Sequence, residues 1–123
     1  MAGKHQEGRN EPIVEPDLAI IDSHHHLFVR PGIHYLFDEY LADTALGHNI
    51  KASVYVETRY NARTDEPEML QPLGKIAFAN GAAELSAAGL SGPCRMAGAI
   101  IGHADLTFGD QIGELLDRTL AAA

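Results

Sequence analysis

The stretch Ala19-Ile20-Ile21-Asp22-Ser23-His24-His25-His26-Leu27-Phe28 decides the fold of this chain. It joins a short apolar run to three histidines, which is the pattern of a buried strand whose last residues carry chemistry. Side chains alternate faces along a strand, so we expect His24 and His26 to project together and His25 to point the other way. Two imidazoles on one side of a strand end form a candidate metal-binding pair.

Outward from this strand, the sequence predicts two further strand and helix units, in an order typical of a parallel sheet. A helix is expected over residues 34–46, and a second strand rich in β-branched and aromatic residues over Lys51–Thr58. A divided helical stretch is predicted over residues 67–89. The third strand is expected over Arg95–His103, and Asp110 is expected to cap the helix that follows.

The composition narrows the class of protein. A net charge of −8 argues against a surface for nucleic acid, which requires clustered basic side chains. No apolar run approaches the roughly 20 residues that cross a bilayer, and no apolar signal segment follows the first methionine. Cys94 is the single cysteine, which suits a reducing cytosol. We therefore expect a cytoplasmic protein with neither nucleic acid nor a membrane as partner and with its oligomeric state open.

Three segments carry a resemblance to a known family. Residues 19–28 resemble the first-strand signature of the amidohydrolase superfamily, in the branch of TIM-barrel metal-dependent hydrolases that includes sugar lactonases and pyrone dicarboxylate lactonases. Residues 41–57, Leu-Ala-Asp-Thr-Ala-Leu-Gly-His-Asn-Ile-Lys-Ala-Ser-Val-Tyr-Val-Glu, resemble the first helix, its loop and the second strand of that family. Residues 98–110, Gly-Ala-Ile-Ile-Gly-His-Ala-Asp-Leu-Thr-Phe-Gly-Asp, resemble its third strand and the start of its third helix.

The resemblance implies an α/β fold made of the first three β/α units of a (β/α)8 TIM barrel. Such a barrel typically needs about 250 residues, and this chain has 123. It is therefore expected to be an N-terminal fragment, with a flexible leader over residues 1–16 and a partial barrel domain over residues 17–123. Three parallel strands would leave two edges unpaired and an apolar face exposed, which predicts an unstable or aggregating isolated chain.

The resemblance also implies site residues. In the family, the His-x-His pair of the first strand holds a divalent metal together with a His and an Asp from later strands. His24 and His26, the histidine pair, are therefore the candidate metal ligands and catalytic residues. Zinc at such a site polarises a carbonyl and makes hydroxide available at neutral pH. Some lactonases of this branch work without a metal, and the two histidines then polarise the substrate carbonyl, so both roles stay open.

Two more candidate catalytic residues lie near the predicted strand ends. Glu57 and His103 lie near the ends of the second and third predicted strands, at the edge where parallel α/β folds assemble their active sites. They would bind substrate or orient a water. The alternatives are a solvated carboxylate for Glu57 and a packed or capping side chain for His103. His25 is expected to be structural, and Asp22 to accept a hydrogen bond on the same face as the histidine pair.

The expected function is hydrolysis of a lactone, ester or amide of a small polar metabolite, by attack of water on an activated carbonyl. One alternative is metal-dependent decarboxylation, the reaction of a related branch with the same barrel. Product analysis separates the two, because hydrolysis releases an acid without carbon dioxide. The other alternative is an inactive, truncated remnant of such an enzyme.

Overall fold

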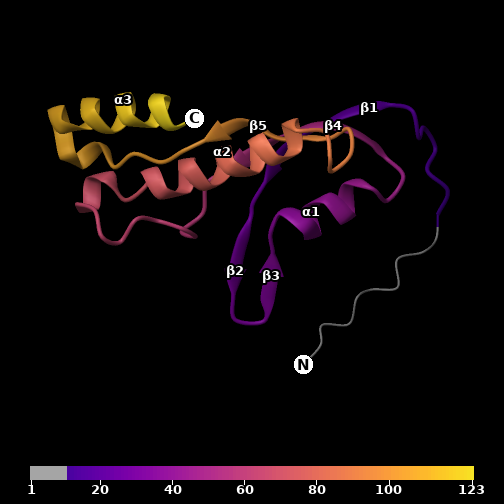
Figure 1. Ribbon diagram of the computed structural model, residues 1–123, viewed down its shortest axis with the longest axis horizontal. Helices are drawn as coiled ribbons and strands as arrows, with labels where there is room; N and C mark the ends of the chain where they lie inside the picture. The colour runs from indigo at the N-terminus through magenta and orange to yellow at the C-terminus, as the bar shows by residue number, and fades with distance from the viewer. Residues whose placement is uncertain (1–10) are drawn as a thin grey trace.

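The computed structural model describes residues 11–123, so most of the predicted leader, residues 1–10, lies outside the described residues. Strands, α-helices and two short 3-10 helices, η1 and η2, alternate along the chain (Figure 1). Their order is β1 (Ala19–His25), β2 (Phe28–Arg30), β3 (Ile33–Tyr35), α1 (Phe37–Thr44), β4 (Asn49–Val56), η1 (Glu68–Leu70), α2 (Leu73–Ala87), β5 (Arg95–Ile101), η2 (Leu106–Gln111) and α3 (Ile112–Ala122).

The three predicted long strands form one parallel sheet in the order β1-β4-β5. This confirms the α/β class and the parallel arrangement expected from the alternation of strands and helices. The backbone N–H of Glu57, just beyond β4, donates to the carbonyl of Ile101 at 2.9 Å and ties the ends of β4 and β5 together. The three strands therefore end at one edge of the sheet, where side chains from different strands can meet.

A β-bulge interrupts the end of β1. Asp22 pairs with Ser53 and His25 pairs with Tyr55, so three steps along β1 match two steps along β4. Aligned residues of neighbouring strands share a face, so Asp22 and His25 lie on the face that Ser53 and Tyr55 occupy. His24, one residue before His25, faces away from them. The prediction that Asp22 shares a face with the histidine pair is therefore wrong, because the bulge inverts the alternation.

One face of the sheet is covered by helices, and the other is open. The main buried cluster combines side chains of α1, α2, β4 and β5 with Leu27. Its members are Leu27, Tyr40, Tyr55, Ala79, Ala82, Cys94, Met96 and Ala97. On the opposite face Ile21 and Ile101 remain 59% and 52% exposed, so helices α1 and α2 leave an apolar sheet surface uncovered.

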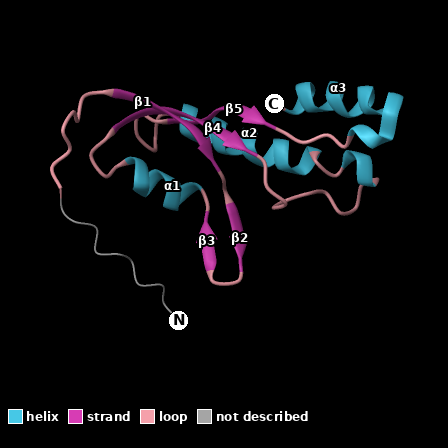
Figure 2. Ribbon diagram, turned by 180° about the vertical axis from the view of Figure 1, so that it is seen from behind, coloured by secondary structure: helices cyan, strands magenta, loops and turns pink. Residues whose placement is uncertain are grey.

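A β-hairpin replaces the first part of the helix predicted over residues 34–46. Strands β2 and β3 pair antiparallel through the turn at Pro31 and Gly32, and α1 begins only at Phe37. Gly32 has a φ of +79°, the left-handed region that glycine adopts without strain. The hairpin extends away from the sheet next to α1 (Figure 2).

The second helical region is divided as predicted. Pro67 precedes η1, and Pro72 precedes the first residue of α2. Gly74 lies so close to the backbone carbonyl of Asn61 that a Cβ atom there would overlap it. Glycine at this position therefore lets the loop after β4 pack directly against the start of α2.

The cap of the last helical region differs from the prediction. Asp105, not Asp110, provides the capping carboxylate, which accepts a hydrogen bond from the backbone N–H of Thr107 at 2.9 Å at the start of η2. Helix α3 then packs against α2, with Leu115 almost fully buried, whereas Leu120 is 78% exposed. Within residues 11–123, no helix combines the length and the apolar character that crossing a membrane requires.

Candidate functional site

The imidazoles of the histidine pair meet beyond the end of β1. Nε2 of His24 lies 3.1 Å from Nε2 of His26, and the two rings are nearly perpendicular, at 86°. Two nitrogen atoms that share one tetrahedral zinc ion, each about 2.0–2.1 Å from it, lie roughly 3.3 Å apart. The spacing therefore suits two ligands of one ion, and it equally allows one imidazole to donate a hydrogen bond to the other.

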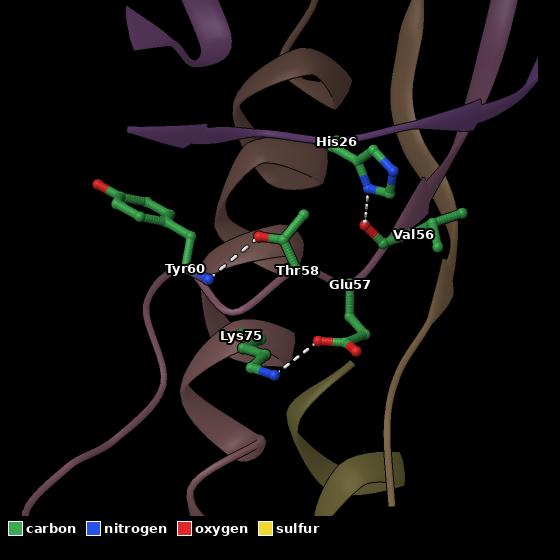
Figure 3. A network of polar contacts seen from close by, with 6 residues as sticks. All are labelled: His26, Val56, Glu57, Thr58, Tyr60 and Lys75. Atoms are coloured by element: carbon green, nitrogen blue, oxygen red, sulfur yellow. Dashed lines mark hydrogen bonds and ion pairs between the residues drawn. The ribbon is translucent and has the colours of Figure 1, made fainter. Parts of the chain in front are cut away.

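A backbone carbonyl of the neighbouring strand orients His26. Its Nδ1 lies 2.8 Å from the carbonyl oxygen of Val56, the last residue of β4 (Figure 3). A carbonyl can only accept, so Nδ1 carries the hydrogen and Nε2 of the neutral ring carries the lone pair. Metal-binding histidines usually donate their second N–H in this way. His26 is therefore prepared as a metal ligand or as a proton acceptor, and His24 is the donor within the metal-free pair.

His25 has a structural place on the covered face, as expected. It is 6% exposed, its ring stacks on that of Tyr40 with centroids 4.3 Å apart, and its Nδ1 donates to the carbonyl of Val54 at 3.1 Å. Burial lowers the pKa of His25, which favours the neutral ring. Burial also raises the pKa of Tyr40, and the Asp22 carboxylate, which accepts from the Tyr40 hydroxyl at 2.8 Å, contributes to that rise.

Glu57 is part of an ion pair with α2. Its Oε2 lies 2.6 Å from Nζ of Lys75, a residue that is only 7% exposed (Figure 3). A contact this short between two charged groups is a charge-assisted hydrogen bond. The pair fastens the segment directly after Val56 to α2.

His103 lies in a different place from the histidine pair. It is exposed on the loop after β5 and lines a cavity of about 240 Å³ together with Arg59, Lys75 and Asp105. The histidine pair does not line this cavity. The structure thus brings His24 and His26 together, places Glu57 directly after the residue whose carbonyl His26 contacts, and places His103 in a separate cavity that Lys75 also lines.

Two contributors to the site escaped the sequence analysis. The carbonyl of Val56 leaves no trace in the sequence, because any residue could supply it. Lys75 does leave a signal, since it interrupts an apolar helical segment in which Leu73, Ile76 and Ala79 are all buried. A charged side chain among buried neighbours predicts a partner, and the partner is the carboxylate at the end of β4.

The histidine pair offers two of the three protein ligands that a catalytic zinc site generally uses. Within residues 11–123, no group of three or more His, Cys, Asp or Glu side chains is arranged to hold a metal ion. Comparison of the chain with protein-family models, with curated proteins and with solved structures gave no match.

Proposed function

We propose that this chain belongs to a cytosolic, amidohydrolase-type hydrolase that activates the carbonyl of a lactone, ester or amide towards water. The observation that carries the proposal is the convergence of the two Nε2 atoms of the histidine pair, with the Nδ1 proton of His26 held by the Val56 carbonyl. No other group in the described residues combines converging imidazoles with a fixed tautomer at a strand end.

The fold supports a barrel as the wider setting. A parallel sheet with helices on one face and exposed isoleucines on the other is what three consecutive units of a (β/α)8 barrel would look like, since the open face would line the barrel interior. The histidine pair would then stand at the C-terminal end of the barrel strands, where such folds bind their substrates.

His24 and His26 would hold a divalent metal, zinc in the first instance, at two of its coordination positions. When bound, the metal supplies Lewis-acid polarisation of the carbonyl and activation of a water. His26 is suited to hold it, because its Nε2 lone pair is fixed by the bond from Nδ1 to the Val56 carbonyl.

The histidines can also act directly on protons. When substrate enters, the bond between the two Nε2 atoms opens. The Nε2–H of His24 then donates to the substrate carbonyl oxygen, and Nε2 of His26 accepts a proton from the attacking water. The water oxygen forms a bond to the carbonyl carbon, the bond from that carbon to the leaving oxygen of a lactone or ester, or to the leaving nitrogen of an amide, breaks, and the proton on His26 passes to that leaving atom. The Val56 carbonyl keeps Nδ1 protonated throughout, so Nε2 remains the site of exchange.

Glu57 and His103 are proposed to assist at the rim. Glu57 serves as a positioning residue, because its ion pair with Lys75 fixes the backbone that presents the Val56 carbonyl. His103 is proposed to contact the distal part of the substrate from the neighbouring cavity, into which Lys75 also extends.

The test is hydrolysis of dihydrocoumarin near neutral pH, with and without added Zn²⁺. We expect His24→Asn and His26→Asn each to lower the rate about 100-fold or more. His34→Asn is the matched control, because His34 is an exposed histidine of the hairpin that bonds Glu39 and lies on no strand end. Equal rates in the His26 and His34 variants would contradict the proposal. Stoichiometric carbon dioxide from a carboxylated substrate would favour decarboxylation instead.

A further inference from the structure

A hollow of about 440 Å³ opens directly beside the histidine pair. Three of the side chains that line the hollow come from the hairpin, namely Phe28, Ile33 and Tyr35, and α1 supplies Tyr40. Phe28 pairs with Tyr35 across the hairpin, and Ile33 pairs with Arg30. Side chains alternate along each strand, so Phe28, Arg30, Ile33 and Tyr35 share one side, which we call the hairpin face, although Arg30 does not line the hollow. The hollow is therefore lined by the hairpin face and the imidazoles together.

The aromatic walls of this hollow are held in place by their own contacts. The hydroxyl of Tyr35 donates to the carboxylate of Asp43 in α1. The guanidinium of Arg30 stands 4.8 Å from the centroid of the Phe28 ring, within the range of a cation–π interaction. Side chains whose rings are already held in place lose little conformational freedom when a ligand binds, so the entropy cost of binding is small.

The charges around the hollow favour an uncharged ligand. Among the described residues that line it, none is a lysine or an arginine. Asp22 supplies a carboxylate, which is already occupied by the hydroxyl of Tyr40. The nearby guanidinium of Arg30 lies against the Phe28 ring. The lining thus consists of aromatic and aliphatic surface, the imidazoles and one occupied carboxylate, and the Arg30 guanidinium stands over the Phe28 ring without lining the hollow.

We propose that the hairpin face binds a planar, uncharged ring of the substrate beside the histidine pair. Aromatic rings interact with flat ligands by offset stacking or edge-to-face contact, and this arrangement removes apolar surface of both partners from water. The inference rests on the proposed function, because the ring is the part of the substrate bonded to the carbonyl that the histidine pair activates. It assigns the hairpin the role of selecting aryl esters and ring-fused lactones over open-chain ones.

Binding of indole, a neutral planar probe, tests this inference without requiring catalysis. The chain contains no tryptophan, so indole fluorescence reports the ligand alone. Ile33→Ala removes part of the hairpin face at a half-exposed position and is expected to weaken indole binding about fivefold. Ile33→Phe enlarges the same wall and is expected to strengthen it. Val29→Ala is the matched control, because Val29 lies on the opposite side of the same hairpin and is similarly exposed.

The outcomes separate this inference from the proposed function. The hairpin face is supported as a ring site if Ile33→Ala weakens indole binding and Val29→Ala does not. Benzoate should also bind more weakly than indole. Equal effects of the two alanine substitutions, or tighter binding of benzoate than of indole, overturn it. Loss of dihydrocoumarin hydrolysis in His24→Asn is scored separately, so the ring site can fail while the hydrolase assignment stands, or the reverse.

Discussion

Replacing Lys75 with methionine tests whether a buried ion pair fastens the end of β4 to α2. The Lys75 side chain is 9% exposed, that of Glu57 is 23% exposed, and their charged atoms lie 2.6 Å apart. Methionine keeps the length and apolar stem of lysine but leaves the Glu57 carboxylate without its partner. Removing one member of a buried pair typically costs about 3–5 kcal/mol. Because Glu57 keeps some contact with water, we expect a loss of about 2–3 kcal/mol in the free energy of unfolding.

Urea unfolding followed by far-ultraviolet circular dichroism measures this loss. A double-mutant cycle with Lys75→Met and Glu57→Gln isolates the energy of the pair from the effects of each substitution alone. The matched control is the pair of Arg118 and Glu114 on α3, whose atoms are 2.8 Å apart but whose side chains are 49% and 54% exposed. There we expect a coupling energy of about 0.3–0.5 kcal/mol.

The comparison isolates burial, because the two pairs have nearly the same separation. A coupling energy several times larger for the β4–α2 pair supports the reasoning. Equal coupling energies in the two cycles would refute it, since burial would then add nothing to the strength of the interaction.

Three further predictions concern the core and the open face. The buried backbone N–H of Ala97 donates to the Ser53 hydroxyl at 3.0 Å. Ser53→Ala removes this acceptor, so urea unfolding should show that the free energy of unfolding falls by about 1–3 kcal/mol. Burial raises the pKa of the Cys94 thiol, so the thiol should react slowly with dithiobis-nitrobenzoate in the folded protein and rapidly in the unfolded protein. Because the thiol ionises more readily in the unfolded protein, the free energy of unfolding should fall as the pH rises past about 9. Fast reaction of the folded chain would contradict this prediction. Ile76→Ala, at a site 2% exposed, should cost about 2–5 kcal/mol, whereas Ile101→Ala on the open face should cost well under half as much; similar losses would show that the open face is covered in solution.

The predictions that succeeded are those that depend on local pattern. The alternation of the histidines, the parallel strands and the division of the second helical region follow from residue type and spacing within a few positions. The hairpin was missed because its strands are only three residues long, and because Leu36, Phe37, Tyr40 and Leu41 already fit a helical period that extends naturally towards residue 34.

The parts that the sequence could not predict are properties of pairs of segments. The bulge between Asp22 and His25 is defined by which residues of β4 lie opposite, and nothing within β1 alone reveals it. Glu57 was placed correctly at a strand end, yet its partner Lys75 lies 18 residues further along the chain. The same holds for the acceptor of the His26 Nδ1 proton, a backbone carbonyl 30 residues away.

The extra residue near the end of β1 decides which side of the sheet each histidine takes. In a regular ladder that kept Ser23, odd- and even-numbered histidines would exchange sides, and His25 would lose its stacking on Tyr40. In a ladder without Ser23, two steps along β1 would match two steps along β4, so His25 would stay opposite Tyr55 and the sides would be kept. The sides that the histidines take therefore depend on the bulge absorbing one residue, and a further one-residue insertion that it does not absorb should be harder to tolerate than most substitutions.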